Sequence, residues 1–344
     1  MPGFPWTSEE HEVVVATCKD AQSLTEATQK AYEKLKDKRT WFAVRNYISQ
    51  YHLLPLPRAG VKREAAGERG FAAIVGELEK KGYRVIREKP GTPGKFFKIP
   101  DRFEGNYFEV GVVSDTQLCS KYQQLTFLHE AYDLFAKRGI QHVLHAGDLM
   151  DGQLIYRGHS YEVLWSGEDA QRDYTVANYP IKKGITTHLI GGNHDYSFYR
   201  TSGSNVLAQI AKQRPDIHYL GDFAGTVEIS GIRIGLRHPR GGVPYARSYR
   251  LQKLIEQLSP QEKPHILLVG HLHIGNYLPM YRNVEGFQVP CFQAQTPFLA
   301  ELGVYPTIAF LILGITIHPK KPGRLVSLKQ EWFYCFNPRT KDWG

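Results

Sequence analysis

From residue 105 onward, short apolar segments alternate with amphipathic ones, and this alternation limits the possible folds more than any other feature of the sequence. The apolar runs that fit buried strands are 108–114, 142–146, 187–190, 266–269 and 310–317. The stretches that fit helices are 122–137, 204–212 and 245–258. Strands that alternate with helices predict an α/β fold built of layers. Residues 225–236 have the pattern of a hairpin, so we expect the sheet to be mixed.

The first hundred residues have a different, mainly helical pattern. Apolar residues recur every three or four positions and predict helices over 21–38, 40–52 and 69–81. A basic segment, 83–99, surrounds a PGTPG turn and predicts a hairpin. This order of elements is typical of a helix-turn-helix or winged-helix module, although a helical cap or dimerisation element fits it as well. A Pro- and Gly-rich stretch then marks a boundary, which gives one domain of residues 1–104 and another of 105–344.

The charge of the chain favours an anionic partner. The chain carries 43 Lys and Arg against 34 Asp and Glu, a net charge of +9. Residues 58–104 alone hold twelve basic and seven acidic residues. A basic balance attracts polyanions such as nucleic acid without identifying one. The N-terminal residues that we expect to contact nucleic acid are Arg39, Arg45, Arg84, Arg87 and Lys95.

The sequence shows no segment suited to a membrane. The apolar run near the C-terminus, 309–317, is nine residues long, whereas a spanning helix needs about 20. The N-terminal residues lack a basic region followed by an apolar block, so no secretion signal is visible. We therefore expect a cytoplasmic protein without a membrane partner, and the sequence does not indicate its oligomeric partners.

Each of five predicted strands in the second domain ends in an unusually polar segment. These segments contain Asp115 and Gln117, Asp148 and Asp151, Asn193 to Asp195, His238, and His271 and His273. Ligands of open α/β sheets gather at the carboxyl ends of strands, so the five segments are expected to converge. Carboxylate, amide and imidazole groups together suit Mn²⁺, Fe²⁺, Zn²⁺ or Co²⁺. The four cysteines lack C-x-x-C spacing, which argues against a structural zinc site.

The spacing of these residues has a physical logic. His271 and His273 leave the same face of a strand, so both can reach one metal or two adjacent metals. Gly147 permits a sharp turn that presents Asp148 at the strand end, and a carboxylate can bridge two cations. Two ions about 3.5–4 Å apart bind a phosphate between them and generate hydroxide near neutral pH. The pattern therefore predicts phosphoester hydrolysis.

In this order the motifs resemble the signature of the calcineurin-like metallophosphoesterases, over roughly residues 106–318. The resemblance implies a four-layer α/β/β/α sandwich of mixed sheets and a centre of two divalent metals. It assigns one metal to Asp115, Gln117, Asp148 and His273, and the other to Asp148, Asn193, His238 and His271. It further implies that His194 stabilises the transition state or protonates the leaving oxygen, with Asp195 orienting the His194 ring.

The sequence departs from this family pattern at one position. The first motif usually reads Asp-x-His, and here Gln117 replaces the histidine. A glutamine carbonyl is a neutral, hard and weaker donor, so we expect an oxygen-rich site that favours Mn²⁺ or Mg²⁺ over Zn²⁺ or iron. Loss of this first site, which leaves a one-metal enzyme, is the alternative. Arg240 and His159 are further candidates for substrate contacts.

Three functions fit these observations. The favoured one is a Mn²⁺-dependent nuclease or nucleic-acid phosphodiesterase whose basic N-terminal module holds the polyanion near the metals. The second is a phosphatase or phosphodiesterase for phosphoproteins or small nucleotides, with the first domain as a cap or oligomerisation element. The third is a nucleic-acid-binding regulator whose phosphoesterase domain is catalytically silent. One fold hosts many chemistries, so the sequence does not choose the substrate, the cleavage polarity or the physiological metal.

Overall fold

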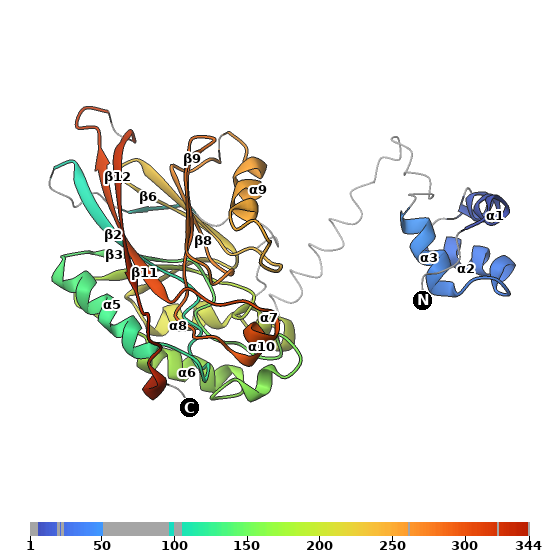
Figure 1. Cartoon of the computed structure of the whole chain (residues 1–344), viewed down its shortest axis with the longest axis horizontal. Helices are drawn as coiled ribbons and strands as arrows, with labels where there is room; N and C mark the ends of the chain where they lie inside the picture. Colours follow the sequence, from blue (N-terminus) through green and yellow to red (C-terminus); the bar gives the residue numbers. More distant parts are fainter. Residues whose placement is uncertain are drawn as a thin grey trace, which may run out of the picture. The chain divides into compact units, whose positions relative to one another are not determined.

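The computed structural model describes residues 6–18, 21, 24–50, 96–99, 105–260, 262–321 and 323–342. The chain divides into two compact units, Met1–Glu88 and Lys89–Gly344, and each is described by itself (Figure 1). Among the described residues, no helix is long and apolar enough to cross a membrane.

The described residues of the first unit form three helices: α1 (Ser8–Cys18), α2 (Leu24–Leu35) and α3 (Trp41–Gln50). Their contacts enclose a small core of Val14, Ala27, Ala31, Val44 and Ile48. The structure confirms the helices expected within 21–38 and 40–52, whereas α1 was not predicted. The helix expected over 69–81 and most of the basic hairpin lie outside the described residues, so the winged-helix interpretation stays a prediction.

Arg39 lies inside this unit rather than on a free basic surface. Its guanidinium donates to both carboxylate oxygens of Glu10, at 2.8 and 2.7 Å, and lies over the ring of Trp6. The Arg39 side chain is only 11% exposed. The expectation that it contacts nucleic acid is therefore corrected, because this ion pair ties α1 to the end of α2. Arg45 lies half-buried on α3, while Arg84, Arg87 and Lys95 lie outside the described residues.

The second unit contains two six-stranded sheets. The first sheet has the order β12-β11-β2-β3-β4-β5, and the second has the order β1-β6-β7-β8-β10-β9. The strands of the first sheet are β2 (Tyr107–Val113), β3 (His142–His145), β4 (Thr186–Ile190), β5 (Ile217–Gly221), β11 (Ala309–Ile317) and β12 (Leu325–Tyr334). Those of the second are β1 (Phe96–Ile99), β6 (Ala224–Ile229), β7 (Ile232–Arg237), β8 (Ile266–Val269), β9 (Asn276–Tyr281) and β10 (Val284–Gln288). Both sheets combine parallel and antiparallel pairs, as the sequence predicted.

Helices cover the outer faces of the two sheets and complete four layers (Figure 1). Apolar residues of α5 (Leu125–Lys137) and α8 (Val206–Gln213) pack on the first sheet, and Leu251 and Ile255 of α9 (Tyr249–Gln257) pack on the second. A third core lies between the sheets, with Val112 and Leu144 against Leu236 and Leu268. The remaining helices of the unit are η1 (His159–Tyr161), α6 (Glu168–Asn178), α7 (Tyr196–Ser202), α10 (Pro297–Glu301) and η2 (Thr340–Asp342). The α/β/β/α sandwich is thus confirmed.

The strand β1 shows that the second unit begins earlier than the boundary placed near residue 105. Phe96 to Ile99 pair in parallel with Thr226 to Ile229 of β6, and Ile99 is buried in the core between the sheets. The segment expected to form part of an N-terminal wing is therefore an edge strand of the sandwich. Its sequence, Phe-Phe-Lys-Ile, suits a strand in either position, and only the tertiary contacts decide between them.

Three neighbouring strands place His142, His188 and His218 beside one another, with Phe97 of β1 against His188 and His218. Burial lowers the pKa of His188, and the charges of His142 and His218 lower it further, to about 3. The folded state therefore favours neutral His188, so its contribution to stability is present above the ordinary pKa of about 6.5 and is lost as the pH falls below it.

We expect His188 to lower the free energy of unfolding by about 2 kcal/mol when the pH falls from 7.5 to 5. Thermal unfolding of the wild type and of His188→Gln at both pH values measures the effect, because glutamine does not titrate. The variant should lose less stability on acidification than the wild type. Equal losses in the two proteins would contradict the prediction.

Candidate metal centre

The five polar segments meet where the two sheets adjoin. Asp115 and Gln117 follow β2, Asp148 follows β3 and Asn193 follows β4, all in the first sheet. The second sheet contributes His238 after β7 and two histidines after β8. Main-chain bonds join the segments: the amide of Asp115 donates to Gly147, and the amide of His271 donates to the Asp115 carboxylate at 3.0 Å. All seven candidate ligands of the sequence analysis thus line one site.

The backbone of this site is unusual. Five of the candidate ligands have φ between 44° and 83°, in the left-handed region that side chains other than glycine rarely adopt. They are Asp115, Gln117, Asp148, His271 and His273. Such residues cost of order 1–3 kcal/mol each and persist only where the surrounding structure fixes them. Their concentration here indicates that the fold is stabilised elsewhere in order to hold these side chains in place.

Asp148 occupies the middle of the site. Its Oδ2 lies 3.1 Å from His238 Nε2, and its Oδ1 accepts the main-chain N–H of His194 at 2.9 Å. His238 Nδ1 lies 2.8 Å from the carbonyl oxygen of Ala146, which fixes Nδ1 as the donor and directs Nε2 into the site. Ligand atoms of Asp148, His238 and His271 all lie within 4.8 Å of one another, close enough to hold one cation.

The second group of candidate ligands surrounds Asp115. His273 Nε2 lies 3.3 Å from Asp115 Oδ1, and Ser114 donates to Asp115 Oδ2 at 2.5 Å. Gln117 is fully buried, and its Nε2 donates to Asp148 Oδ2 at 3.3 Å. This bond brings Gln117, a member of the Asp115 group, into contact with Asp148.

The residues present fit a pair of divalent cations. Two amide oxygens, Gln117 Oε1 and Asn193 Oδ1, are buried and have no hydrogen-bond partner in the described part of the chain. A buried polar atom without a partner costs about 1–3 kcal/mol, so such atoms at a cluster of carboxylates and imidazoles indicate a ligand. Carboxylate, amide and imidazole donors together suit borderline and hard divalent ions.

Charge balance in the site leads to the same conclusion. Burial raises the pKa of the Asp148 carboxyl, but the positive charges of His238 and His194 outweigh it and the net shift is downward. Burial lowers the pKa of His238, but Asp148 and Asp115 outweigh it and raise the pKa to about 9. The carboxylates thus demand positive charge, which protonated imidazoles supply here. A divalent cation is expected to replace those protons, so binding it should release protons.

The main-chain carbonyl of Asp151, and not the carboxylate of Asp195, orients the ring of His194. Its Nδ1 lies 2.6 Å from the carbonyl oxygen of Asp151, which leaves Nε2 directed toward the site, 4.0 Å from Asp148 Oδ2. Asp195 accepts main-chain N–H bonds from Leu149, Met150 and Gly192 at 3.0–3.1 Å. Its predicted role is therefore corrected: both carboxylate oxygens are occupied in bracing the loops that carry Asp148 and Asn193.

His159 lies deeper than a substrate contact requires. Its side chain is 1% exposed, and its Nε2 lies 3.4 Å from Asp151 Oδ2. The rings of His159 and His194 meet edge to face. His159 therefore supports the Asp151–His194 arrangement rather than contacting substrate, which corrects the sequence expectation. In the sequence, Asp151 belongs to the second motif. Its position in that motif was the only sequence feature that indicated its contacts with His159 and His194.

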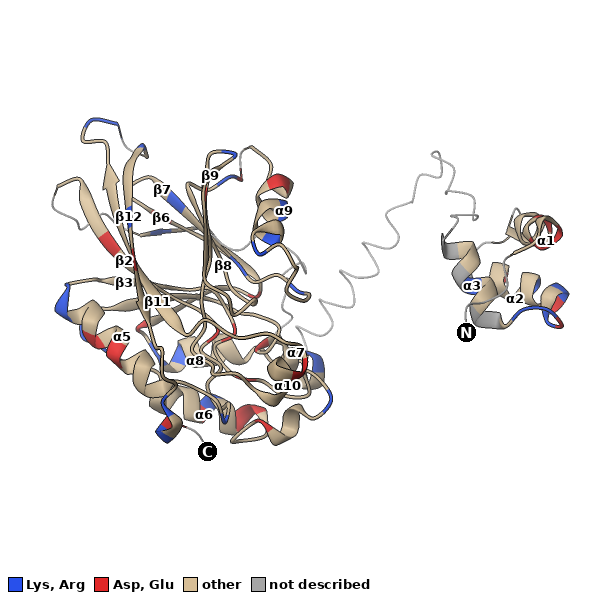
Figure 2. Cartoon of the chain, viewed as in Figure 1, with Lys and Arg blue, Asp and Glu red and all other residues tan. Residues whose placement is uncertain are grey.

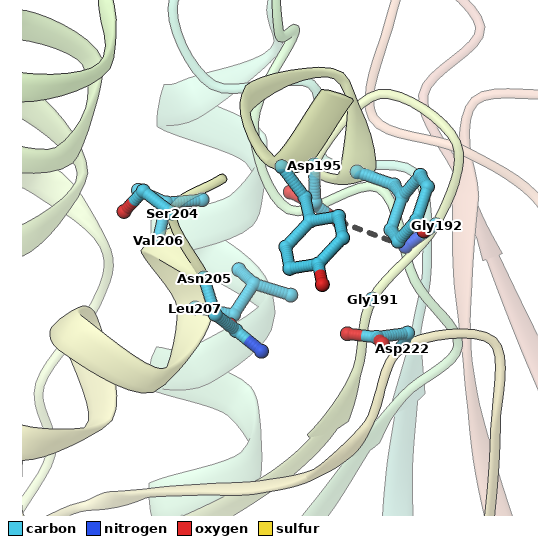
Figure 3. A pocket seen from close by; sticks show the side chains of 10 residues that line it. Gly191, Gly192, Asp195, Ser204, Asn205, Val206, Leu207 and Asp222 are labelled. Carbon is cyan, nitrogen blue, oxygen red and sulfur yellow. Dashed lines mark hydrogen bonds between the residues drawn. The ribbon is translucent and has the colours of Figure 1, made fainter. Parts of the chain in front are cut away.

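Arg240 remains beside the site. Its guanidinium lies over the rings of Tyr196 and Phe223, at 5.6 and 5.1 Å from their centroids. Tyr196 also lines a small pocket behind the Gly192–Asp195 turn, together with Asn205 and Asp222 (Figure 3). An arginine in this position is available to a phosphate group that approaches the candidate metals.

A family model now gives these motifs a name. The model for the calcineurin-like phosphoesterases matches residues 108–304, more than half of the chain. The chain belongs to this family. The matched region of this calcineurin-like phosphoesterase contains every candidate ligand described above.

The relatives include two archaeal polymerase subunits. The DNA polymerase II small subunit of Methanothermobacter thermautotrophicus is 26% identical over 279 residues, which are 66% of this chain and 56% of that protein. The corresponding subunit of Methanocaldococcus jannaschii is 24% identical over 286 residues, 69% of this chain and 47% of that protein. The chain therefore spans about half the length of the curated relatives it matches.

Two of the solved structures that match this chain come from widely separated organisms. A dimetal phosphatase from Danio rerio has 15% identity and a TM-score of 0.37, covering 66% of this chain and 99% of that one. Vps29 from Entamoeba histolytica, complexed with zinc, has 16% identity and a TM-score of 0.33, with the same coverage.

The amide oxygen of Gln117 gives a test of metal preference. Because histidine is a softer and stronger donor than this oxygen, Gln117→His should raise the affinity for Zn²⁺ relative to Mn²⁺ about 10-fold. Calorimetric titration of both proteins with each ion measures the ratio. An unchanged ratio in Gln117→His would show that residue 117 does not ligate.

Proposed function

We propose that this calcineurin-like phosphoesterase is a nuclease that uses two divalent metals, with Mn²⁺ preferred, to hydrolyse phosphodiester bonds of nucleic acid. The observation that carries the proposal is the pair of buried, unpartnered amide oxygens beside the shared carboxylate of Asp148. The basic charge of the chain and the names of its archaeal relatives support a polyanionic substrate.

In the proposed mechanism the protein residues divide the work. Asp115, Gln117, Asp148 and His273 hold one cation, and Asp148, Asn193, His238 and His271 hold the other. When bound, the two cations polarise the phosphate and lower the pKa of water. His194 donates a proton to the leaving oxygen from Nε2, since its Nδ1 is held by the Asp151 carbonyl. Arg240 offers positive charge to the phosphate.

The relatives support a second proposal, which is compatible with the first: the chain acts as a subunit beside a DNA polymerase. Both relatives carry the name DNA polymerase II small subunit. Nuclease activity and association with a polymerase are separate questions, because either can hold without the other. A phosphatase acting on proteins or small nucleotides stays the alternative.

Cleavage of end-labelled single- and double-stranded DNA with Mn²⁺ tests the nuclease proposal directly, and a small aryl phosphate diester and monoester are run in parallel. We expect the full chain to cleave DNA and to prefer the diester. Hydrolysis of the monoester without any DNA cleavage would favour the phosphatase. Failure with all four substrates, in a protein that still binds Mn²⁺, would support a catalytically silent regulator.

A further inference from the structure

A largely exposed segment runs from the end of β7 into α9, directly after the candidate ligand His238. Residues 239–255 hold Arg240, Arg247, Arg250 and Lys253 and contain no Asp or Glu. The same stretch includes two exposed tyrosines, Tyr245, which is fully exposed, and Tyr249, which is half-exposed.

The segment is anchored to the metal centre. His271 Nε2 lies 2.8 Å from the carbonyl oxygen of Gly241, and Arg250 donates to the carbonyl oxygen of Arg240 at 2.6 Å. Gln288 donates to the carbonyl oxygen of Arg247 at 2.9 Å. These bonds use main-chain oxygens, so they fix the course of the segment while they leave the Tyr245 ring in solvent.

The charges of the segment are available to a ligand. Within the part of the chain that the structure describes, no carboxylate forms an ion pair with Arg240 or Arg247. Lys253, in contrast, is already paired with Glu256 at 2.9 Å. Figure 2 shows both basic and acidic residues on α9, in agreement with the pair of Lys253 and Glu256. A basic strip without acidic residues attracts a phosphate backbone.

We infer that residues 240–250, here named the basic segment, bind a single strand of nucleic acid and lead it to the metal centre. The arginines meet successive phosphates, and Tyr245 and Tyr249 stack on bases, whose faces are accessible only when the strand is unpaired. This inference rests on the proposed function and adds a nucleic-acid contact in the phosphoesterase unit to the one expected in the N-terminal unit.

Binding of a fluorescein-labelled oligo(dT) of about 20 nucleotides tests the inference by anisotropy, in EDTA so that no cleavage occurs. The full chain is compared with Tyr245→Ala/Arg247→Ala. We expect about 10-fold weaker binding in the double variant, and a log–log salt slope smaller by about one. The matched control, Lys320→Ala/Phe336→Ala, also removes one exposed basic side chain and one exposed aromatic ring. It should bind oligo(dT) as tightly as the wild type does.

Several outcomes would overturn the inference. Equal losses of oligo(dT) affinity in the test and control variants would show that binding depends only on overall charge. If the wild type does not bind oligo(dT), the segment does not bind a single strand. Duplex DNA bound as tightly as oligo(dT), without an effect of Tyr245, would exclude the single strand. Hydrolysis of a small diester by the wild type reports the proposed function separately, so either idea can fail while the other stands.

Discussion

Asp148→Asn is expected to lower metal-dependent phosphoester hydrolysis at least 1,000-fold, which corresponds to about 4 kcal/mol of transition-state stabilisation. Asp148 lies against candidate ligands of both groups, His238 at 3.1 Å and Gln117 at 3.3 Å. Asparagine keeps the size and one oxygen of the side chain, but it removes the negative charge that the two proposed cations would share.

A measurement that does not depend on turnover separates loss of metal from loss of fold. In the wild type, Mn²⁺ at about 100 times its dissociation constant should stabilise the folded state by about 2.7 kcal/mol, seen as a higher Tm. Asp148→Asn should unfold cooperatively but show little of this Mn²⁺-dependent increase. A variant that keeps both the increase in Tm and the activity would show that Asp148 does not bridge the metals.

The sequence was sufficient to predict the architecture of the second unit because each element carries its own pattern. Buried strands such as 266–269 are continuously apolar, whereas α5 has apolar residues on one face only. The polar residues that follow five of these strands converge, since the carboxyl ends of parallel strands meet at one edge. Their grouping was predictable for that reason, while metal binding by them stays a prediction.

The contacts that orient His194 could not be predicted from the sequence pattern. Motif order places Asp195 next to His194 in sequence, yet the turn directs the Asp195 carboxylate toward the amides of Leu149 and Met150. The group that orients His194 is a main-chain carbonyl at Asp151, from a different loop. Such contacts depend on how two loops pack, which no local pattern records.

The exposed basic segment shows a related limit. From the sequence, Arg240 of this segment was a candidate substrate contact but Arg247 and Arg250 were not, because the sequence does not tell which charges find partners. In the structure Arg39 is enclosed in an ion pair with Glu10, whereas Arg247 lies in an exposed loop beside the metal centre. The distribution of paired and available charges, rather than net charge, therefore decides which basic residues are open to a polyanion.

Gly192→Ala is expected to abolish metal binding and to reduce hydrolysis at least about 100-fold, although it adds a single methyl group. A Cβ at residue 192 would overlap the carboxylate of Asp148 and would lie 2.7 Å from the ring of His238. Both side chains are buried, so neither can move aside without leaving its own bonds. Overpacking of this kind also costs about 1–3 kcal/mol of unfolding free energy.

Gly139→Ala is the matched control, because it makes the same chemical change at the end of α5. Gly139 has φ +70° and nothing within 4 Å of its added Cβ, so alanine there costs about 1–2 kcal/mol through backbone strain alone. We expect Gly139→Ala to lose stability but to keep the Mn²⁺-dependent rise in Tm, and Gly192→Ala to lose both. Should both variants lose Mn²⁺ binding equally, general destabilisation would explain the effect. A Gly192→Ala protein that binds Mn²⁺ normally would show that the Asp148 carboxylate does not need its present position.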